Sequence, residues 1–467
     1  MKSVLNCLLC FLITFVFMIA SLLVTAVIPK DLIQKKSEES AQQLMRMDTH
    51  FYNVIDGSPG RDTPRVGDFS KMDQYADAVS LSMAYYIDPA HPLKSILWAN
   101  YYNGREDTEH RLDTMNESYA LSVKGNTEPN TEYLRYWHGS LILIRTMHVL
   151  WNYTEIKTIL GITLAVLLAI LLFLLLHHGY RAEAICLGVS LFAVSVWFVP
   201  ISLEYVWMFL LMAVISIFAV RTCISGKSER LGLLMFLSGM LAAYFDFFTT
   251  ETITLLIPLL LSIRILGRKS SEKKLWILSL NCGLLWGIGY IACWAMKWIF
   301  SAVVLHETVI PLIQHYFLYH LGALDEMTAL QRIQYSILRN LWPLFPFGYG
   351  TIGAVLFALC ALAFIYLVLQ GKLRLKQSIR KSRILLYALL GVVVYLRYIV
   401  LRHHVYYHYF FTYRAQSASI LALCFILLEV MELAGRGKSE PGENTPLSLD
   451  RQSANESSTD ESSGPST

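Results

Sequence analysis

Residues 56–73 read DGSPGRDTPRVGDFSKMD and residues 101–118 read YYNGREDTEHRLDTMNES, and these two stretches set the architecture expected for the chain. Both are dense in charged and turn-forming residues, and their apolar runs are short. They belong to a polar block over residues 30–157. This block cannot cross a bilayer, because each unpaired polar group in hydrocarbon costs several kcal/mol. We therefore expect it to lie in water or along the membrane surface.

The composition of the whole chain is that of a membrane protein. Of the 467 residues, 55% are hydrophobic and 16% are charged, which is too apolar for an ordinary soluble protein. The net charge of +4 is small, and we expect no nucleic-acid partner. All eight cysteines lie within or at the edges of apolar segments. This placement excludes a disulfide-stapled exterior domain and a thiolate metal cluster with close ligand spacing.

The first apolar segment, residues 4–28, is an uncharged run long enough to cross about 30 Å of hydrocarbon as a helix. A cleaved signal peptide is the alternative, but its apolar part would span only about 7–15 residues before a small-residue cleavage site. The run here is longer and ends in Val27-Ile28-Pro29. We therefore expect an uncleaved transmembrane anchor over residues 1–29.

Nine further apolar segments follow the polar block. They fall at about 158–177, 184–203, 205–222, 231–248, 250–266, 276–304, 351–370, 384–402 and 416–434. The two segments within 231–266 are short, and the long segment at 276–304 must tilt or project. These segments form a predicted membrane domain over residues 158–434. Together with the anchor, they predict an all-α polytopic membrane protein. It would have about ten transmembrane helices and a large exterior loop of juxtamembrane helices between the first two.

The distribution of basic residues predicts the orientation of the chain. Connections on the side of the N-terminus carry many Lys and Arg, whereas the short connections near 204 and 249 carry none. An excess of basic residues marks the cytoplasmic side. We therefore expect a multi-pass cell-membrane protein with both termini cytoplasmic and the 30–157 loop outside. Residues 435–467 are rich in Ser, Glu, Pro and Gly, which predicts a disordered cytoplasmic tail.

The stretch SKMDQYADAVSLSMAYYI, residues 70–87, has apolar residues at helical spacing. Two further helices are expected near 92–102 and 133–151. Asp73 and Asp77 are four residues apart and so share one face of the first helix. Two carboxylates on one face repel each other unless a divalent cation, a basic partner or a shared proton uses them. The alternative is that they form the solvated side of a surface helix, and the identity of any metal stays open.

Two other outward-facing stretches carry candidate residues. YFDFFTTE, residues 244–251, places Asp246 in the outer turn between two short spans, where an unpaired acid is costly. Capping of a helix is the alternative role. RYWHGSLILIR, residues 135–145, places His138 and Arg145 just before the second span. Anchoring at the lipid–water interface is the ordinary role of Trp and Arg in such a stretch.

The stretch RHHVYYHYFFTYR, residues 402–414, joins two spans on the outside. His404 and His408 have the spacing that can chelate a metal ion if the segment is helical. Arginines such as Arg414 make a transition metal less favourable and an anion more favourable, because a guanidinium holds phosphate oxygens bidentately. Arginine outside is also an exception to the positive-inside rule. An aromatic belt at the membrane surface is the alternative interpretation.

The motifs for nucleotide chemistry are absent. There is no Walker A lysine loop, no GxGxxG after a strand and no GxSxG elbow. Carboxylates on one element, with Arg and His on others at the level of the lipid, suit a polyprenyl-phosphate-linked sugar. Its tail would lie in the bilayer, its phosphate on Arg and His, and the acceptor hydroxyl at a carboxylate general base.

The order of these stretches resembles the GT-C superfamily of membrane glycosyltransferases and, more narrowly, multi-span proteins of Gram-positive gut bacteria. Five stretches carry the resemblance: MDQYADAVSLSMAYYID, YLRYWHGSLILIRTM, AAYFDFFTTETITLLIPLL, WGIGYIACWAMKW and RHHVYYHYFFTYR. The resemblance implies a catalytic acid in the first exterior loop, here Asp77 or Asp73. It also implies phosphate binding by Arg414, His404 and His408. The acid lies farther after the first span here than in many GT-C enzymes.

The expected function is that of a GT-C-like glycosyltransferase moving a sugar, or a related envelope group, from a polyprenyl-phosphate donor. Asp77 and Asp73 are the expected catalytic residues. The expected substrate-binding residues are Arg414, His404, His408, Asp246, His138 and Arg145. A divalent cation is the one cofactor that the carboxylates suggest, and membrane lipid is an expected partner. The alternatives are a lipid or glycan transporter, for which polar residues in the spans are sparse, and a non-catalytic envelope assembly factor.

Overall fold

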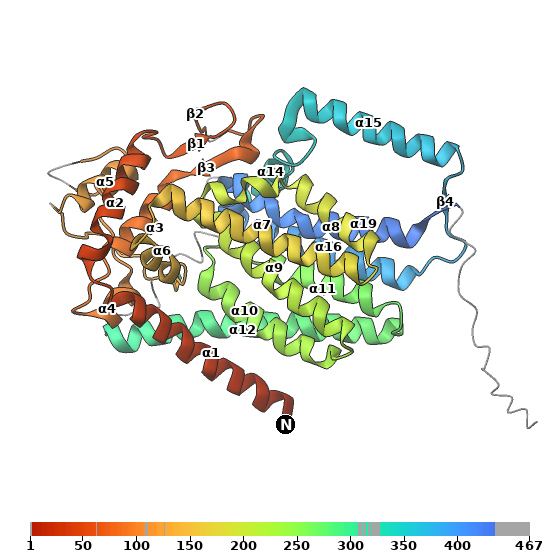
Figure 1. Cartoon of the computed structure of the whole chain (residues 1–467), viewed down its shortest axis with the longest axis horizontal. Coiled ribbons are helices and arrows are strands. Elements are labelled where there is room, and N and C mark those ends of the chain that lie inside the picture. The colour runs from red at the N-terminus through yellow and green to blue at the C-terminus, as the bar shows by residue number, and fades with distance from the viewer. Residues whose placement is uncertain are drawn as a thin grey trace, which may run out of the picture.

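The computed structural model describes residues 2–434, apart from 62, 108–110, 126, 307–310, 312–313, 316–317 and 319–326. The tail expected over 435–467 lies outside the described residues. The regular secondary structure of the described chain is almost entirely helical, with two small β-sheets. Figure 1 shows a block of short helices and strands at one end of a bundle of long helices.

Seven helical segments are long and apolar enough to cross a membrane, which confirms the expected class of α-helical membrane protein. They are α1 (Lys2–Ala26), α7 (Tyr153–His177), α9 (Leu203–Ile224), α12 (Glu272–Leu305), α15 (Gly350–Leu369), α16 (Lys381–Val400), and the run from α18 (Tyr409–Thr412) through η5 (Tyr413–Ala415) into α19 (Gln416–Val430). The α15 span includes η4 (Phe347–Tyr349).

Three other predicted spans form shorter helices. These are α8 (Arg181–Ala193), α10 (Leu231–Phe245) and α11 (Ile253–Leu266), of 13, 15 and 14 residues. At about 1.5 Å per residue, each falls short of a hydrocarbon core of about 30 Å. Helix α8 is followed, after a break, by η2 (Val196–Ile201), and η3 (Ser228–Arg230) precedes α10. Most residues of α10 and α11 are buried inside the bundle.

Helices α10 and α12 pack closely because glycines line their contact. A Cβ atom at Gly239 would lie 2.1 Å from the carbonyl oxygen of Trp286, and one at Gly289 would lie 2.3 Å from that of Phe236. Small residues are what allow the backbones of membrane helices to approach this closely. The crossing therefore depends on the absence of side chains at these two positions.

Residues 30–157 form a unit that we call the exterior block, after the position expected for it. Ion pairs join the ends of the long helices that lie far from this block (Figure 1). Arg264 of α11 pairs with Glu183 of α8 at 3.1 Å and also with Glu429 of α19. Arg383 of α16 pairs with Glu272 of α12 at 2.5 Å. Nearby, β4 (Leu373–Leu375) and β5 (Met431–Leu433) form an antiparallel pair. Several of the basic residues that predicted the orientation therefore also hold the helices together.

The exterior block is packed around helices and a sheet. Its helices are α2 (Lys30–Met45), α3 (Gln74–Tyr85), α4 (Pro92–Trp98), α5 (Met115–Val123) and α6 (Leu141–His148). Its antiparallel sheet has the order β2–β1–β3, formed by Ser58–Pro59, Phe51–Asn53 and Lys71–Asp73, with η1 (Asp68–Ser70) before β3.

The three helices expected in this block exist, but with different bounds. The one expected over 70–87 begins only at Gln74, because residues 71–73 are a strand. The one expected over 92–102 ends at Trp98, and the one expected over 133–151 begins at Leu141. The sheet, α2 and α5 were not predicted. Capping by polar side chains, such as Thr114 and Glu117 at the start of α5, sets several of these ends.

Candidate functional site

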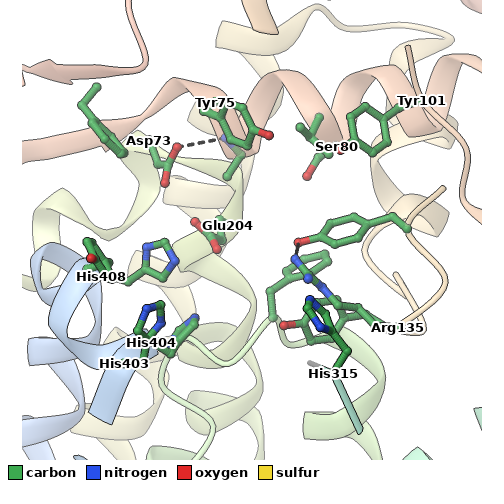
Figure 2. A pocket seen from close by; sticks show the side chains of 17 residues that line it. Asp73, Tyr75, Ser80, Tyr101, Arg135, Glu204, His315, His403, His404 and His408 are labelled. Atoms are coloured by element: carbon green, nitrogen blue, oxygen red, sulfur yellow. Dashed lines mark hydrogen bonds between the residues drawn. The ribbon is translucent and has the colours of Figure 1, made fainter. Parts of the chain in front are cut away.

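A cavity of about 510 Å³ lies where the exterior block meets the helix bundle. Its polar lining residues are Asp73, Ser80, Arg135, Glu204, His315, His403, His404 and His408. Its aromatic lining residues are Phe51, Tyr75, Tyr101, Tyr133, Tyr136, Phe247 and Tyr407. Figure 2 shows the labelled side chains among these arranged around one space, although their elements are far apart in the chain.

Two carboxylates belong to the cavity wall. Asp73 ends β3 and caps α3, because its Oδ1 accepts a hydrogen bond from the backbone N–H of Ala76 at 2.9 Å. The side chain is buried. Burial raises the pKa of Asp73 to about 7, and the nearby charge of Asp77 acts in the same direction. Glu204, in the first turn of α9, lies on the same wall (Figure 2).

Three histidines form another part of the wall. They come from α17 (Arg402–Tyr407) and its C-terminal cap: His403, His404 and His408. The ring centroids of His404 and His408 are 4.5 Å apart, as the four-residue spacing on a helix predicts. Burial and the positive charge of Arg332 lower the pKa of His403 to about 4. The positive charge of Arg332 therefore opposes protonation of His403, whereas a bound anion would favour protonation of His403.

Arg135 adds a permanent positive charge to the cavity. Its guanidinium lies 4.4 Å from the ring centroid of Tyr133 and 5.3 Å from that of Tyr136. It also donates a hydrogen bond to the hydroxyl of Tyr133 at 2.7 Å. In Figure 2 it lies on the opposite side of the space from His404. A guanidinium on one side and imidazole groups on the other give the cavity hydrogen-bond donors that can hold an anion such as a phosphate.

Asp77 does not line this cavity, although it was expected in the site. It is buried one turn farther along α3 and accepts hydrogen bonds from three groups. These are the Tyr153 hydroxyl at 2.5 Å, the Ser202 hydroxyl at 2.7 Å and the Leu203 backbone N–H at 2.8 Å. Burial raises the pKa of Asp77. Its carboxylate fastens α3 to the beginnings of α7 and α9.

Arg414 also lies outside the cavity wall. It is fully buried and donates hydrogen bonds to the carbonyl oxygens of Phe410 at 3.0 Å and Phe69 at 2.8 Å. Its guanidinium lies 5.0 Å from the ring centroid of Tyr205. These contacts join η5 to η1 of the exterior block. Arg414, which the positive-inside rule did not predict at this position, therefore packs against that block.

Asp246 lies in the turn between α10 and α11, beside the cavity but not on its wall. It accepts hydrogen bonds from the backbone N–H of Thr249 at 3.0 Å and from the Thr249 hydroxyl at 2.5 Å. The carboxylate therefore stabilises the turn itself and does not cap a helix, because the cap position of α11 is Thr252. The same turn is held by Arg397 of α16, whose Nε donates to Glu251 at 2.5 Å. Its neighbour Phe247 does line the cavity.

His138 and Arg145 are buried structural groups. The Nε2 of His138 donates to the carbonyl oxygen of Tyr133 at 2.7 Å, and burial lowers the pKa of His138 to about 3. Arg145 donates to the carbonyl oxygens of Ala84 and of Ile28, the latter at 2.6 Å. Burial lowers the pKa of Arg145 to about 10. Arg145 therefore joins the end of α3 to the segment after α1.

Within the described part of the chain, the paired carboxylates form no evident site for the suggested divalent cation. Among the residues that the structure describes, no group of three or more His, Cys, Asp or Glu side chains is arranged to hold a metal ion. Asp73 and Asp77 do not share a ligand position, because the first faces the cavity and the second faces α7 and α9.

Several lining residues were not identified as site residues from the sequence. Glu204 is one of the sparse polar residues of the apolar segments, and the sequence alone predicts no role for it. An ionisable side chain at the start of a membrane helix is energetically unfavourable, and such residues usually have a function. This rule could have marked Glu204 as a candidate site residue. Arg135 and the tyrosines gave no such signal, because Arg and Tyr near a membrane surface are usually anchors.

The fold and the cavity define a class of protein. The chain is a polytopic α-helical membrane protein with a polar, partly basic cavity between its exterior block and its membrane helices. Comparison with protein-family models, with curated proteins and with solved structures finds no match for this chain.

Proposed function

We propose that this chain is a GT-C-like membrane glycosyltransferase. It transfers a sugar, or a related envelope group, from a polyprenyl-phosphate donor to an acceptor hydroxyl at the outer face of the cytoplasmic membrane. One observation carries the proposal: a single cavity at the junction with the membrane helices combines carboxylates with histidines and an arginine. This is the set of groups that a phosphate leaving group and a hydroxyl acceptor require.

The proposal includes a topology of ten membrane helices, with both termini cytoplasmic and the exterior block outside. Helices α8, α10 and α11 are the short members of the ten. Backbone without helical hydrogen bonds is tolerated at membrane depth only where it is buried in protein or lines a cavity. The turn after α10 meets this condition, because Asp246 and Glu251 are buried and Phe247 lines the cavity.

In this mechanism Asp73 is the general base. Its carboxylate takes the proton of the acceptor hydroxyl, whose oxygen attacks the anomeric carbon of the donor sugar. The bond from that carbon to the phosphate oxygen breaks, and its electron pair leaves with the polyprenyl phosphate. Arg135, His404 and His408 stabilise the developing negative charge. A pKa of about 7 allows Asp73 to take up and release a proton near neutral pH.

In this mechanism, the expected site residues that lie outside the cavity wall hold the surrounding elements in place. Asp77 holds the helix whose first residue follows Asp73, and Arg414 holds the exterior block against η5. Asp246 shapes the turn that presents Phe247 to the cavity. In this proposal they are positioning residues, because their polar atoms contact the protein and do not face the cavity.

The test uses the full chain in phospholipid vesicles with a panel of labelled polyprenyl-phosphate monosaccharides. The measured quantity is release of polyprenyl phosphate. Asp73→Asn should lower turnover by about 10²–10⁴-fold, the usual contribution of a general base. Because Asn is as good a helix N-cap as Asp, α3 should keep its start. Asp113→Asn, in an exposed part of the exterior block, is the matched control.

Three results would contradict the mechanism. Turnover by Asp73→Asn at the level of Asp113→Asn would exclude Asp73 as the base. Movement of labelled donor across the vesicle bilayer without release of polyprenyl phosphate would favour the transporter. Co-purification with a separate transferase, in the absence of either activity, would favour the assembly factor.

A further inference from the structure

Helix α14 (Ala329–Leu341) has an unusual distribution of polar and apolar side chains. Arg332, Ser336 and Asn340 repeat every four residues and are buried, whereas Leu330 and Leu338 are 66% and 60% exposed. A helix on the surface of a water-soluble protein buries its apolar stripe and exposes its polar one. The arrangement in α14 therefore requires an apolar environment on part of its outer side.

The buried polar side of α14 is used by the helix that carries the cavity histidines. Ser336 donates a hydrogen bond to the carbonyl oxygen of Arg402 at 2.7 Å, and Asn340 donates to that of Val405 at 3.2 Å. The guanidinium of Arg339 lies 3.7 Å from the ring centroid of Tyr406. These contacts hold α17 against α14.

The neighbours of α14 in the chain place it near the end of the membrane spans. A candidate span begins at Phe347, shortly after α14 ends, and Figure 1 shows α14 beside the beginning of α15. Its partner α17 lies between a span that ends at Val400 and one that begins at Tyr409. Trp342 follows α14 and is 40% exposed, as is typical of aromatic residues at a lipid–water interface.

The outer side of α14 is not uniformly apolar, since Gln331 and Gln334 are exposed beside Leu330 and Leu338. This mixture suits a helix that lies in the plane of the interface, with one flank in lipid and the other in water. The apolar surface continues onto α15, of which only 6% of the span is buried. Continuity with a candidate span favours lipid over a protein as the occupant of this surface.

We infer that α14 is an in-plane membrane helix that lies in the outer leaflet, with Leu330 and Leu338 inserted among lipid chains. From this position it supports α17, and hence the histidine wall of the cavity, from the lipid side. The inference concerns the contact of α14 with lipid and does not depend on the reaction proposed above.

The experiment places a photoreactive benzophenone amino acid at Leu330 or Leu338 in the full chain, reconstituted in phospholipid vesicles. Lipid adducts on the intact protein are measured by mass spectrometry after illumination. Ile352 on α15, 71% exposed in a candidate span, sets the yield for contact with lipid. Lys124, exposed at the end of α5, sets the yield for contact with water.

We expect adduct yields at both leucines close to that at Ile352 and several-fold above that at Lys124. Yields at the level of Lys124 would overturn the inference, as would crosslinks to a second polypeptide in place of lipid. Both leucine side chains are exposed, so the replacements leave the packing of α14 on α17 intact. Before illumination, gel filtration of each substituted protein should give the same profile as the unsubstituted protein, which shows that the fold is retained.

Discussion

Asp73 and Asp77 are four residues apart, yet only Asp73 faces the cavity. The difference arises because Asp73 caps the helix from outside it, whereas Asp77 lies inside the first turns. The backbone of a capping residue is extended, so the rule that residues four apart share one helix face does not apply to Asp73. At the scale of single residues, the end of the helix thus separates a candidate catalytic group from a positioning group.

The first prediction concerns the stability that Asp77 provides. Asp77→Asn keeps one oxygen that can accept from Ser202 and Leu203, but its NH₂ group cannot accept the hydrogen bond that the Tyr153 hydroxyl donates. A buried donor left without an acceptor costs about 1–3 kcal/mol. Thermal unfolding in detergent micelles should therefore shift to lower temperature. Asp113→Asn should not shift it, and an equal midpoint for the two variants would contradict the role given to Asp77.

The second prediction follows from the raised pKa of Asp73, from 3.8 to about 7 because of burial. The folded protein keeps this proton to a higher pH than the unfolded chain does. The resulting stability is therefore complete at low pH and is lost as pH rises through about 7. Relative to Asp73→Asn, the unfolding temperature of the unsubstituted protein should fall between about pH 4 and pH 7 and level off at higher pH. A difference that is flat or rises with pH would show that Asp73 is ionised throughout.

At the scale of elements, the short helices α10 and α11 are placed by their neighbours. Gly239 brings the backbone of α10 against α12, and the ion pair between Arg397 and Glu251 holds the following turn against α16. This turn contributes Phe247 to the cavity wall. The packing of buried helices therefore affects the shape of the cavity directly.

The third prediction concerns the contact between α10 and α12. Gly239→Ala places a Cβ atom 2.1 Å from the carbonyl oxygen of Trp286, so the two helices must separate. Overpacking of this kind costs about 1–3 kcal/mol, and the unfolding temperature in detergent should fall. Gly283→Ala on α12 is the matched control, because its Cβ would meet nothing within 4 Å. Equal unfolding temperatures for the two variants would contradict the close packing.

At the scale of the whole molecule, polar contacts over long sequence separations join the exterior block to the membrane helices. Lys297 of α12 donates to the carbonyl oxygen of Leu97 at 2.8 Å. Tyr409 of α18 donates to the buried carboxylate of Asp68 at 2.7 Å. Because the cavity lies between the two parts, contacts of this kind determine its width. A change in how the block sits on the bundle would alter the cavity without altering any lining residue.

The fourth prediction concerns orientation. In a chain with Cys360→Ser, Lys124→Cys in the exterior block should react with a membrane-impermeant maleimide in intact cells. Lys227→Cys, exposed between α9 and η3, should react only after the cells are permeabilised. The reason is the excess of basic residues in the connections on the side of Lys227. The reverse pattern would show that the exterior block is cytoplasmic.

The membrane class and the approximate positions of the apolar helices follow from the amino-acid sequence alone. Each of the ten apolar segments contains a helix, because the backbone in lipid must satisfy its hydrogen bonds locally. The sequence also identified Asp73, His404 and His408, which line the cavity, since charged and metal-ligand residues are conspicuous near apolar spans. The sheet of the exterior block was missed, because its strands have only two or three residues.

Only the tertiary structure decided which polar side chains meet. Asp77 and Arg414 resemble site residues in the sequence, but each is occupied by partners from distant parts of the chain. Glu204 and Arg135 resemble structural residues, but they reach the cavity wall. The physical reason is that burial and hydrogen-bond partners depend on packing between elements, whereas helix formation in a membrane depends on the local run of apolar residues.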